Sequence, residues 1–178
     1  MKILAIADDD FEVCKIECIC PDVLLTLGDL HDVTISRAID HYCPDVTFGV
    51  RGNHDVERPF PPGVIDLHCR VEEYGGLRFS GFAGSWKYKD QGHHMFEQDE
   101  VAAMLANHPP TDLFIAHNSP AGMHERDTNI HQGFRAFNAY IERCQPSWFL
   151  HGHQHCEDVT AHGRTQVIGV YGERVFET

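Results

Sequence analysis

The sequence lacks any apolar run that approaches the length of a membrane-spanning helix, which needs about 20 consecutive apolar residues. Its first apolar stretch, Ile3 to Ala7, leads directly into three aspartates and not into the cleavage region of a signal peptide. Linkers, internal repeats and low-complexity tracts are also lacking. We therefore expect a cytoplasmic protein without membrane contacts, folded as a single domain over residues 1–178.

Basic residues are scarce, with 14 Lys and Arg against 27 Asp and Glu and a formal net charge of −13. This balance disfavours a broad surface that tracks the phosphates of an extended nucleic-acid duplex. An acidic small substrate is still compatible with the charge, because bound metal ions can be the largest local charges in a site. The net charge therefore restricts the surface but not a pocket.

The cysteines do not form a disulfide framework, since they are seven in number and scattered through apolar or mixed contexts. Cys14, Cys18 and Cys20 lie close together, but no Cys or His pair follows them at the spacing of a zinc ribbon. We expect reduced thiols in ordinary packing positions.

What the sequence does contain is one pattern repeated five times, in which a short apolar run of the kind typical of a buried strand ends in polar residues. The polar clusters are Asp8-Asp9-Asp10, Gly28-Asp29, Gly52-Asn53-His54-Asp55, His117-Asn118 and Gly152-His153-Gln154-His155. Any one of them is also typical of a tight turn. Together they place carboxylate, amide and imidazole groups at strand ends, where ligands bind in open α/β sheets and where metal ions find their usual ligands.

Helical periodicity separates the predicted strands, which indicates an α/β fold with parallel pairing. The expected helices cover 34–42, 97–107 and 133–144, and 11–19 reads as a short helix or an irregular turn. A further strand is expected at 77–82, a polar loop at 121–133, and two or three antiparallel strands after residue 155.

The five clusters, taken in order, resemble the signature of the calcineurin-like metallophosphoesterases, and the resemblance extends from about residue 3 to residue 155. It implies a four-layer α-β-β-α sandwich of two mixed sheets flanked by helices. It also implies a metal-dependent hydrolase that cleaves a phosphomonoester or phosphodiester by attack of a metal-bridging hydroxide at a dinuclear site.

Carried over position by position, the resemblance assigns seven metal ligands and two catalytic residues. Asp8, Asp10, Asp29 and His155 would hold the first metal, and Asp29, Asn53, His117 and His153 the second. His54 would assist departure of the leaving oxygen, with Asp55 orienting its imidazole. His153 and His155 alternate along an extended segment, so a backbone bend is needed there, which we expect Gly152 to permit.

Asp10 departs from the family pattern, which has histidine at this position. If all three carboxylates bind, the two divalent ions and their ligands carry a net charge of about +1 instead of about +2. Added carboxylate favours hard cations, so we predict two metal ions, Mn²⁺ or an Fe/Mn pair, with Mg²⁺ and Zn²⁺ as alternatives. In a second interpretation Asp10 does not ligate, and Asp9 or water takes its place.

The substrate expected from these features is a small phosphoester such as a nucleotide, a cyclic nucleotide or a nucleic-acid end. Candidate groups for orienting ligands or meeting phosphate oxygens are Asn118, His131, Arg51, Arg58, Arg126 and Arg135. Arg51 also resembles the residue before Gly-Asn-His in serine/threonine phosphatases, which leaves a phosphoprotein substrate open. The alternative function is a catalytically reduced scaffold or binding protein with the same fold. The sequence leaves the oligomeric state open.

Overall fold

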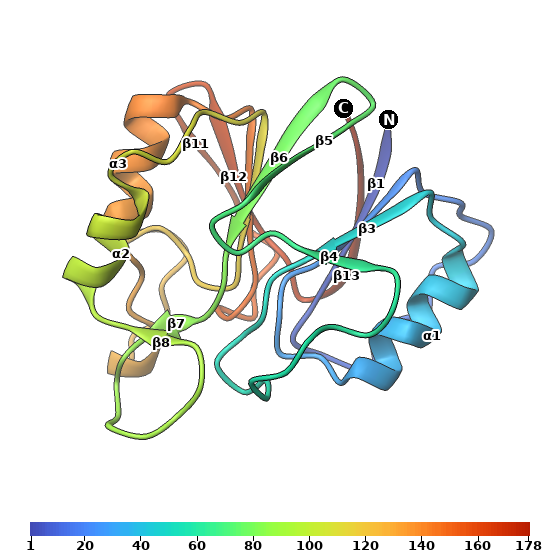
Figure 1. The fold of residues 1–178 in the computed structure, drawn as a ribbon, viewed down its shortest axis with the longest axis horizontal. Coiled ribbons are helices and arrows are strands. Elements are labelled where there is room, and N and C mark those ends of the chain that lie inside the picture. The colour runs from blue at the N-terminus through green and yellow to red at the C-terminus, as the bar shows by residue number, and fades with distance from the viewer.

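Two β-sheets packed face to face form the centre of the computed structural model, which describes residues 1–178 (Figure 1). Helix α1 (Asp32–Tyr42) lies on the outer side of one sheet, and α2 (Gln98–Leu105) and α3 (Arg135–Cys144) lie on the outer side of the other. The predicted four-layer α-β-β-α sandwich is confirmed. None of the helices combines the length and apolar composition that crossing a bilayer requires.

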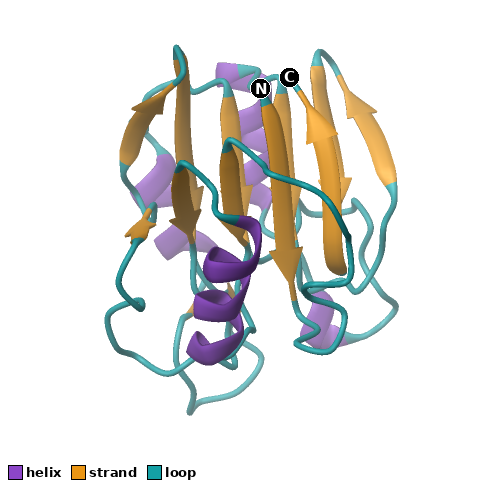
Figure 2. Cartoon of the chain, turned by 90° about the vertical axis from the view of Figure 1, so that its right-hand side faces the viewer, coloured by secondary structure: helices purple, strands orange, loops and turns teal.

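The first sheet has the strand order β13-β1-β2-β3-β4, and its strands run side by side in Figure 2. Strands β1 to β4 are parallel to one another, and β13 pairs with β1 in the antiparallel direction. The bounds are β1 (Lys2–Ala7), β2 (Val23–Thr26), β3 (Val46–Gly49), β4 (Val64–Asp66) and β13 (Gly172–Glu177).

The second sheet has the order β11-β12-β10-β9-β6-β5, with four parallel strands in the middle and an antiparallel strand at each edge. Its strands are β5 (Val71–Tyr74), β6 (Leu77–Phe82), β9 (Leu113–Ala116), β10 (Trp148–His151), β11 (Val159–His162) and β12 (Thr165–Gly169). Two short elements complete the chain, the pair β7 (Ser85–Trp86) with β8 (Met95–Phe96) and the 3₁₀ turn η1 (Asn129–His131).

Three apolar clusters hold the four layers together, and strand β1 shows how. Its side chains alternate, so that Ile3 and Ala5 belong to the cluster between the sheets, while Leu4 and Ile6 belong to the cluster beneath α1. A strand that is buried on both faces is apolar along its whole length. The central strands could therefore be predicted from continuous apolar runs in the sequence. The third cluster fills the space between the second sheet and helices α2 and α3.

Several local expectations need correction or completion. Of the two structures expected for residues 11–19, the irregular turn is the one that forms, and the Glu173 carboxylate holds it by accepting hydrogen bonds from the backbone N–H groups of Cys14, Lys15 and Ile16. Strands β4 and β5 were not foreseen. After residue 155 only β11 and β12 form an antiparallel hairpin, since β12 is parallel to β10 and β13 crosses to the other sheet.

Candidate metal centre

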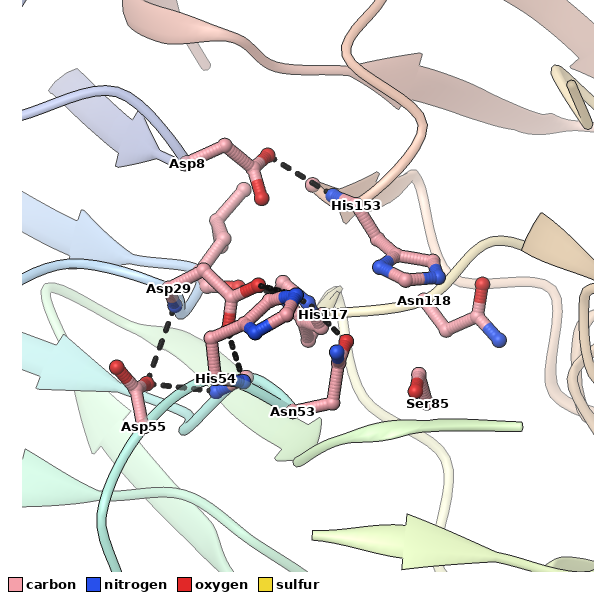
Figure 3. A network of polar contacts seen from close by, with 12 residues as sticks. Asp8, Asp29, Asn53, His54, Asp55, Ser85, His117, Asn118 and His153 are labelled. Carbon is pink, nitrogen blue, oxygen red and sulfur yellow. Dashed lines mark hydrogen bonds and ion pairs between the residues drawn. The ribbon is translucent and has the colours of Figure 1, made fainter. Parts of the chain in front are cut away.

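The five polar clusters meet at the carboxyl ends of parallel strands from both sheets. Asp8, Asp29 and Asn53 follow the neighbouring strands β1, β2 and β3 of the first sheet, and His117 and His153 follow the neighbouring strands β9 and β10 of the second. Parallel strands present their carboxyl ends at one edge of a sheet. The candidate ligands therefore converge where the carboxyl ends of the strands of one sheet face those of the other sheet (Figure 3).

Asp29, His117 and His153 form a group that could hold a metal ion, because each offers a ligand atom and these atoms all lie within 4.8 Å of one another. His117 Nε2 lies 3.3 Å from Asp29 Oδ2 and 3.1 Å from Asn53 Oδ1, and its other ring nitrogen is 2.8 Å from the Leu27 carbonyl oxygen. A carbonyl partner on the far nitrogen fixes the ring orientation of a ligating histidine. The predicted residues Asp29, Asn53, His117 and His153 are thus brought together.

Asp8 lies beside this group as a buried carboxylate whose Oδ2 accepts a 2.9 Å bond from the His153 N–H and whose Oδ1 has no hydrogen-bond partner. A buried, partnerless charge is costly, and proteins normally pair such a group or use it to bind a metal. Burial raises the pKa of the Asp8 carboxyl to about 7. The residues present therefore fit a bound cation, which would supply the missing partner.

Charge is distributed unevenly over the imidazoles of this group. Burial by itself lowers the pKa of His117, but the Asp29 carboxylate outweighs this effect and raises it to about 9. For Asp29, burial raises the pKa and His117 lowers it, leaving it well below its usual range. Burial lowers the pKa of His153 to about 3, so His153 is the neutral imidazole that metal ligation requires.

Four of the candidate ligands have left-handed backbone conformations, which are rare for residues other than glycine. Their φ angles are 63° for Asp8, 53° for Asp29, 62° for His153 and 48° for His155. Gly152 is not among the residues with positive φ, so the left-handed conformations of this turn belong to His153 and His155 and not to the glycine. Backbone strain of this kind concentrates at functional sites.

Close approach of two turns explains the glycine of the Gly-Asn-His-Asp segment. A Cβ atom at Gly52 would collide with the Asp29 carboxylate, and one at Gly28 would collide with the Gly52 backbone. Both glycines allow the turn after β2 to touch the turn after β3. The His54 N–H then donates a 2.8 Å hydrogen bond to Asp29 Oδ1.

His54 and Asp55 differ in their surroundings. The His54 side chain is 69% exposed, and its Nε2 lies 4.0 Å from Asp29 Oδ2, so the imidazole stands beside the metal group and can be reached from solvent. The Asp55 carboxylate accepts bonds of 2.7 Å and 3.1 Å from the N–H groups of Gly52 and Asp29. These bonds hold the backbone of the two turns (Figure 3), and an effect of Asp55 on the His54 imidazole stays a prediction.

Asp10 and His155 lie further out than the other candidate ligands. The Asp10 carboxylate accepts a 3.0 Å bond from the His31 N–H and lies 2.5 Å from His31 Nδ1, which ties it to the start of α1. His155 Nε2 lies 3.9 Å from Asp8 Oδ1, and its ring faces Tyr171. His155 is therefore within reach of Asp8, whereas in this structure the Asp10 carboxylate is engaged by His31.

The candidate substrate groups divide into two sets. Arg51 and Arg58 line one pocket with Asp29 and His54. Asn118 is buried and its side chain is used within the protein, since its Nδ2 donates to the Gln132 carbonyl oxygen.

The remaining candidates lie on or near the loop 121–133. The His131 ring lies 5.0 Å from the His153 ring. The Arg126 guanidinium lies 3.5 Å from His155 Nδ1, and Arg135 begins α3. Of this set, His131 and Arg126 come near the metal group.

Gln154 and Tyr88 have site contacts that the sequence patterns did not identify. Gln154 is buried, and its Nε2 donates hydrogen bonds to Asn118 Oδ1, Ser119 Oγ and the His131 carbonyl oxygen. It thereby fastens the loop 121–133 to the turn that carries His153 and His155. The Tyr88 hydroxyl oxygen lies 3.5 Å from Asn53 Nδ2. For Gln154, the available signal was its place between two candidate ligand histidines.

A family model described as calcineurin-like phosphoesterase matches residues 6–157. The chain belongs to this family. The matched range contains all of the candidate metal ligands, so the resemblance drawn from the motifs is confirmed. No curated protein matches the chain.

Solved structures with the family fold resemble the chain at low identity. The protein TT1561 of Thermus thermophilus is 14% identical with a TM-score of 0.60, and the match covers 94% of this chain and 88% of that one. The phosphopantetheinyl hydrolase PptH from Mycobacterium tuberculosis is 13% identical with a TM-score of 0.60, covering 96% and 89%. A zinc-complexed wild-type Vps29 from Entamoeba histolytica is 11% identical with a TM-score of 0.51, covering 97% and 74%. At these identities the likeness concerns the fold alone.

Proposed function

We propose that this protein is a metal-dependent phosphoesterase that hydrolyses a small phosphomonoester or phosphodiester at a dinuclear metal centre. The observation that supports this most strongly is the buried Asp8 carboxylate, whose partnerless Oδ1 lies beside the Asp29, His117 and His153 group. Membership of the calcineurin-like phosphoesterase family also supports phosphoester hydrolysis as the reaction.

Seven residues would hold the metal ions in this proposal, namely Asp8, Asp10, Asp29, Asn53, His117, His153 and His155. When bound, two such ions supply positive charge for the phosphoryl oxygens and lower the pKa of a coordinated water. The carboxylate-rich set favours Mn²⁺ or an Fe/Mn pair, since hard cations prefer oxygen ligands. A small nucleotide is the substrate we favour, because the −13 net charge disfavours extended duplexes.

The chain's own residues would position the substrate and move the proton. His54 stands beside Asp29 with an exposed imidazole, so it can give a proton to the leaving oxygen and regain one from solvent. Asp29 and Asp55 hold the His54 turn in place through backbone hydrogen bonds. This arrangement keeps the proposed proton donor on a hydrogen-bonded turn beside the candidate metal group.

The test is hydrolysis of bis- and mono-(4-nitrophenyl) phosphate by protein stripped with EDTA and reloaded with Mn²⁺, Fe²⁺ with Mn²⁺, Mg²⁺ or Zn²⁺. We expect turnover with Mn²⁺ or the mixed pair, loss of turnover in Asp29→Ala, and a fall of about 10²–10⁴-fold in kcat for His54→Ala. His41→Ala, which removes an exposed histidine of α1, is the control and should keep wild-type rates.

Absence of hydrolysis with every metal would reject the enzyme and leave the alternative, a scaffold or binding protein. The engagement of Asp10 by His31 is the observation that favours this alternative. Metal binding in such a protein would persist without turnover, which calorimetry with Mn²⁺ would show.

A further inference from the structure

A pocket opens directly beside Asp29 and His54, with a volume of about 510 Å³ that includes open solvent. Its lining is mostly charged or polar and includes Asp29, Asp32, Arg51, His54, Val56 and Arg58. A cleft of this kind next to a reactive group is where part of a small ligand is expected to lie.

The two arginines of the pocket have different surroundings. Arg51 is buried, donates a 2.7 Å bond to Asp32 Oδ1 and a 3.2 Å bond to the Pro59 carbonyl oxygen, and lies over the Phe60 ring at 3.9 Å. These contacts fix the guanidinium group within the wall of the pocket. The Arg51 guanidinium is therefore used within the wall of the pocket.

Arg58 remains available to a ligand. Its side chain is 57% exposed, and one guanidinium nitrogen lies 2.7 Å from Asp32 Oδ2. Arg51 already balances the single negative charge of Asp32, so this group of three side chains carries a net positive charge. A guanidinium has five N–H donors in a planar fork, and the ion pair with Asp32 leaves donors of Arg58 free for a second anion.

The other two acidic residues of the pocket, Asp29 and Asp55, already have partners. Asp29 belongs to the group that would bind metal, and the Asp55 carboxylate is engaged by the N–H groups of Gly52 and Asp29. Apolar contact is available from Val56, which is 48% exposed. A bound group in this pocket thus meets an apolar surface and the exposed guanidinium of Arg58, which has N–H donors that Asp32 does not use.

We propose that the pocket binds the leaving group of the phosphoester, and that the substrates of this protein carry a second anionic group there, which Arg58 binds. This proposal rests on the proposed function, because His54 lines the same pocket and the leaving oxygen must lie next to His54. The substrate class is therefore a phosphoester whose alcohol portion bears a carboxylate or a further phosphate.

The test uses pairs of substrates that differ only in the charge of the leaving group. The first pair is 3-carboxyphenyl phosphate and 3-carbamoylphenyl phosphate. In the second pair, a two-carbon chain separates the carboxylate or the carbamoyl group from the phenyl ring. Release of inorganic phosphate by the Mn²⁺-loaded protein gives kcat/KM for each substrate. We expect a preference of about five- to tenfold for the carboxylate in at least one pair, the range of an exposed charge-assisted hydrogen bond.

Arg58→Gln should remove this preference by lowering kcat/KM for the carboxylate substrate, while the carbamoyl substrate stays within about twofold. Arg70→Gln removes an exposed arginine outside the pocket lining and should leave the preference unchanged. Equal rates within both pairs, or an equal loss on all substrates in Arg58→Gln, would overturn the proposal while the phosphoesterase function stands. Failure to hydrolyse any of the four substrates with any of the metals would count against both.

Discussion

His117 Nε2 lies 3.3 Å from Asp29 Oδ2, and this contact joins the two sheets at the candidate metal centre. Asp29 follows β2 in the first sheet and His117 follows β9 in the second. Each is also tied to the first sheet's turns, His117 through the Leu27 carbonyl oxygen and Asp29 through the His54 N–H. The geometry of the site is therefore set by the packing of the two sheets. Substitutions of candidate ligands should then change metal binding without preventing folding.

Asp8→Asn should separate these two properties most clearly. The substitution removes a buried negative charge whose Oδ1 is unpaired, while the amide oxygen can still accept the bond from the His153 N–H. We expect the free energy of unfolding of the EDTA-treated variant to equal that of the wild type or to exceed it by up to about 1–3 kcal/mol. Its Tm should accordingly be unchanged or higher. The rise in Tm on adding Mn²⁺ should shrink or disappear.

Differential scanning fluorimetry with and without Mn²⁺ measures both effects. Asp40→Asn is the matched control, because Asp40 is an exposed carboxylate of α1 and belongs to no candidate metal group. A full Mn²⁺-dependent rise in Tm for Asp8→Asn would show that Asp8 is not a ligand.

The sequence predicted the parts of this site that depend on short-range pattern. Strands buried on both faces give continuous apolar runs, so β1, β2, β3, β9 and β10 and the polar residues after them could be located. The family resemblance then placed those residues in one centre, and the structure brings Asp29, His117 and His153 together.

Contacts between distant turns could not be predicted in the same way. Asp55 has the spacing expected of a partner for the neighbouring His54, yet its carboxylate bonds the Asp29 N–H because the glycines allow two turns to touch. The pairing of β13 with β1 joins strands from the two ends of the chain and has no local signal. The left-handed backbone of His153 was likewise hidden, since most histidines have negative φ even though the type is enriched among the exceptions.

Asp10 decides between two interpretations that metal analysis can distinguish. If Asp10 ligates, Asp10→His should move the metal content toward zinc, because a nitrogen ligand replaces a hard oxygen ligand. If Asp10 only holds His31 at the start of α1, Asp10→Asn should lower stability by about 0.5–2 kcal/mol and leave metal content and its preference unchanged.

Elemental analysis of protein purified without chelator, together with urea unfolding, covers both variants of Asp10. Asp40→His is the control for an added histidine, because Asp40 is exposed on α1 and is no candidate ligand. Wild-type protein that is fully occupied by zinc and most active with zinc alone would contradict the predicted preference for Mn²⁺ or Fe/Mn.

Gln154→Leu should release the loop 121–133 from the metal centre. The variant leaves the polar partners of Gln154 unsatisfied, among them Ser119 Oγ and the His131 carbonyl oxygen. We expect a loss of about 1–3 kcal/mol in the free energy of unfolding, faster tryptic cleavage at Arg126, and a lower kcat/KM. Gln166→Leu, an exposed position on β12, should keep wild-type stability and cleavage. Unchanged cleavage at Arg126 in Gln154→Leu would show that the loop is held by other contacts.

His108 should make the stability of the protein depend on pH at a place far from the metal ligands. The side chain is buried, its Nε2 lies 2.6 Å from Ser80 Oγ, and its ring packs against Phe114 and Tyr140. Burial lowers the pKa of His108 from its usual 6.5, and the positive charges of Arg143 and Arg78 lower it further. The folded state therefore binds fewer protons than the unfolded state once the pH falls below 6.5.

The contribution of His108 to stability is thus present above pH 6.5 and is lost as the pH falls toward the depressed pKa of the folded state. The free energy of unfolding in urea, measured on EDTA-treated protein at pH 7.5, 6.5 and 5.5, should decline more steeply in the wild type than in His108→Gln. The difference in slope from this one group is at most about 1.4 kcal/mol per pH unit. His41→Gln, an exposed substitution on α1, should keep the wild-type slope. Parallel declines for the wild type and His108→Gln would show that His108 takes up its proton without cost, and the acid sensitivity would then have to come from the other buried imidazoles.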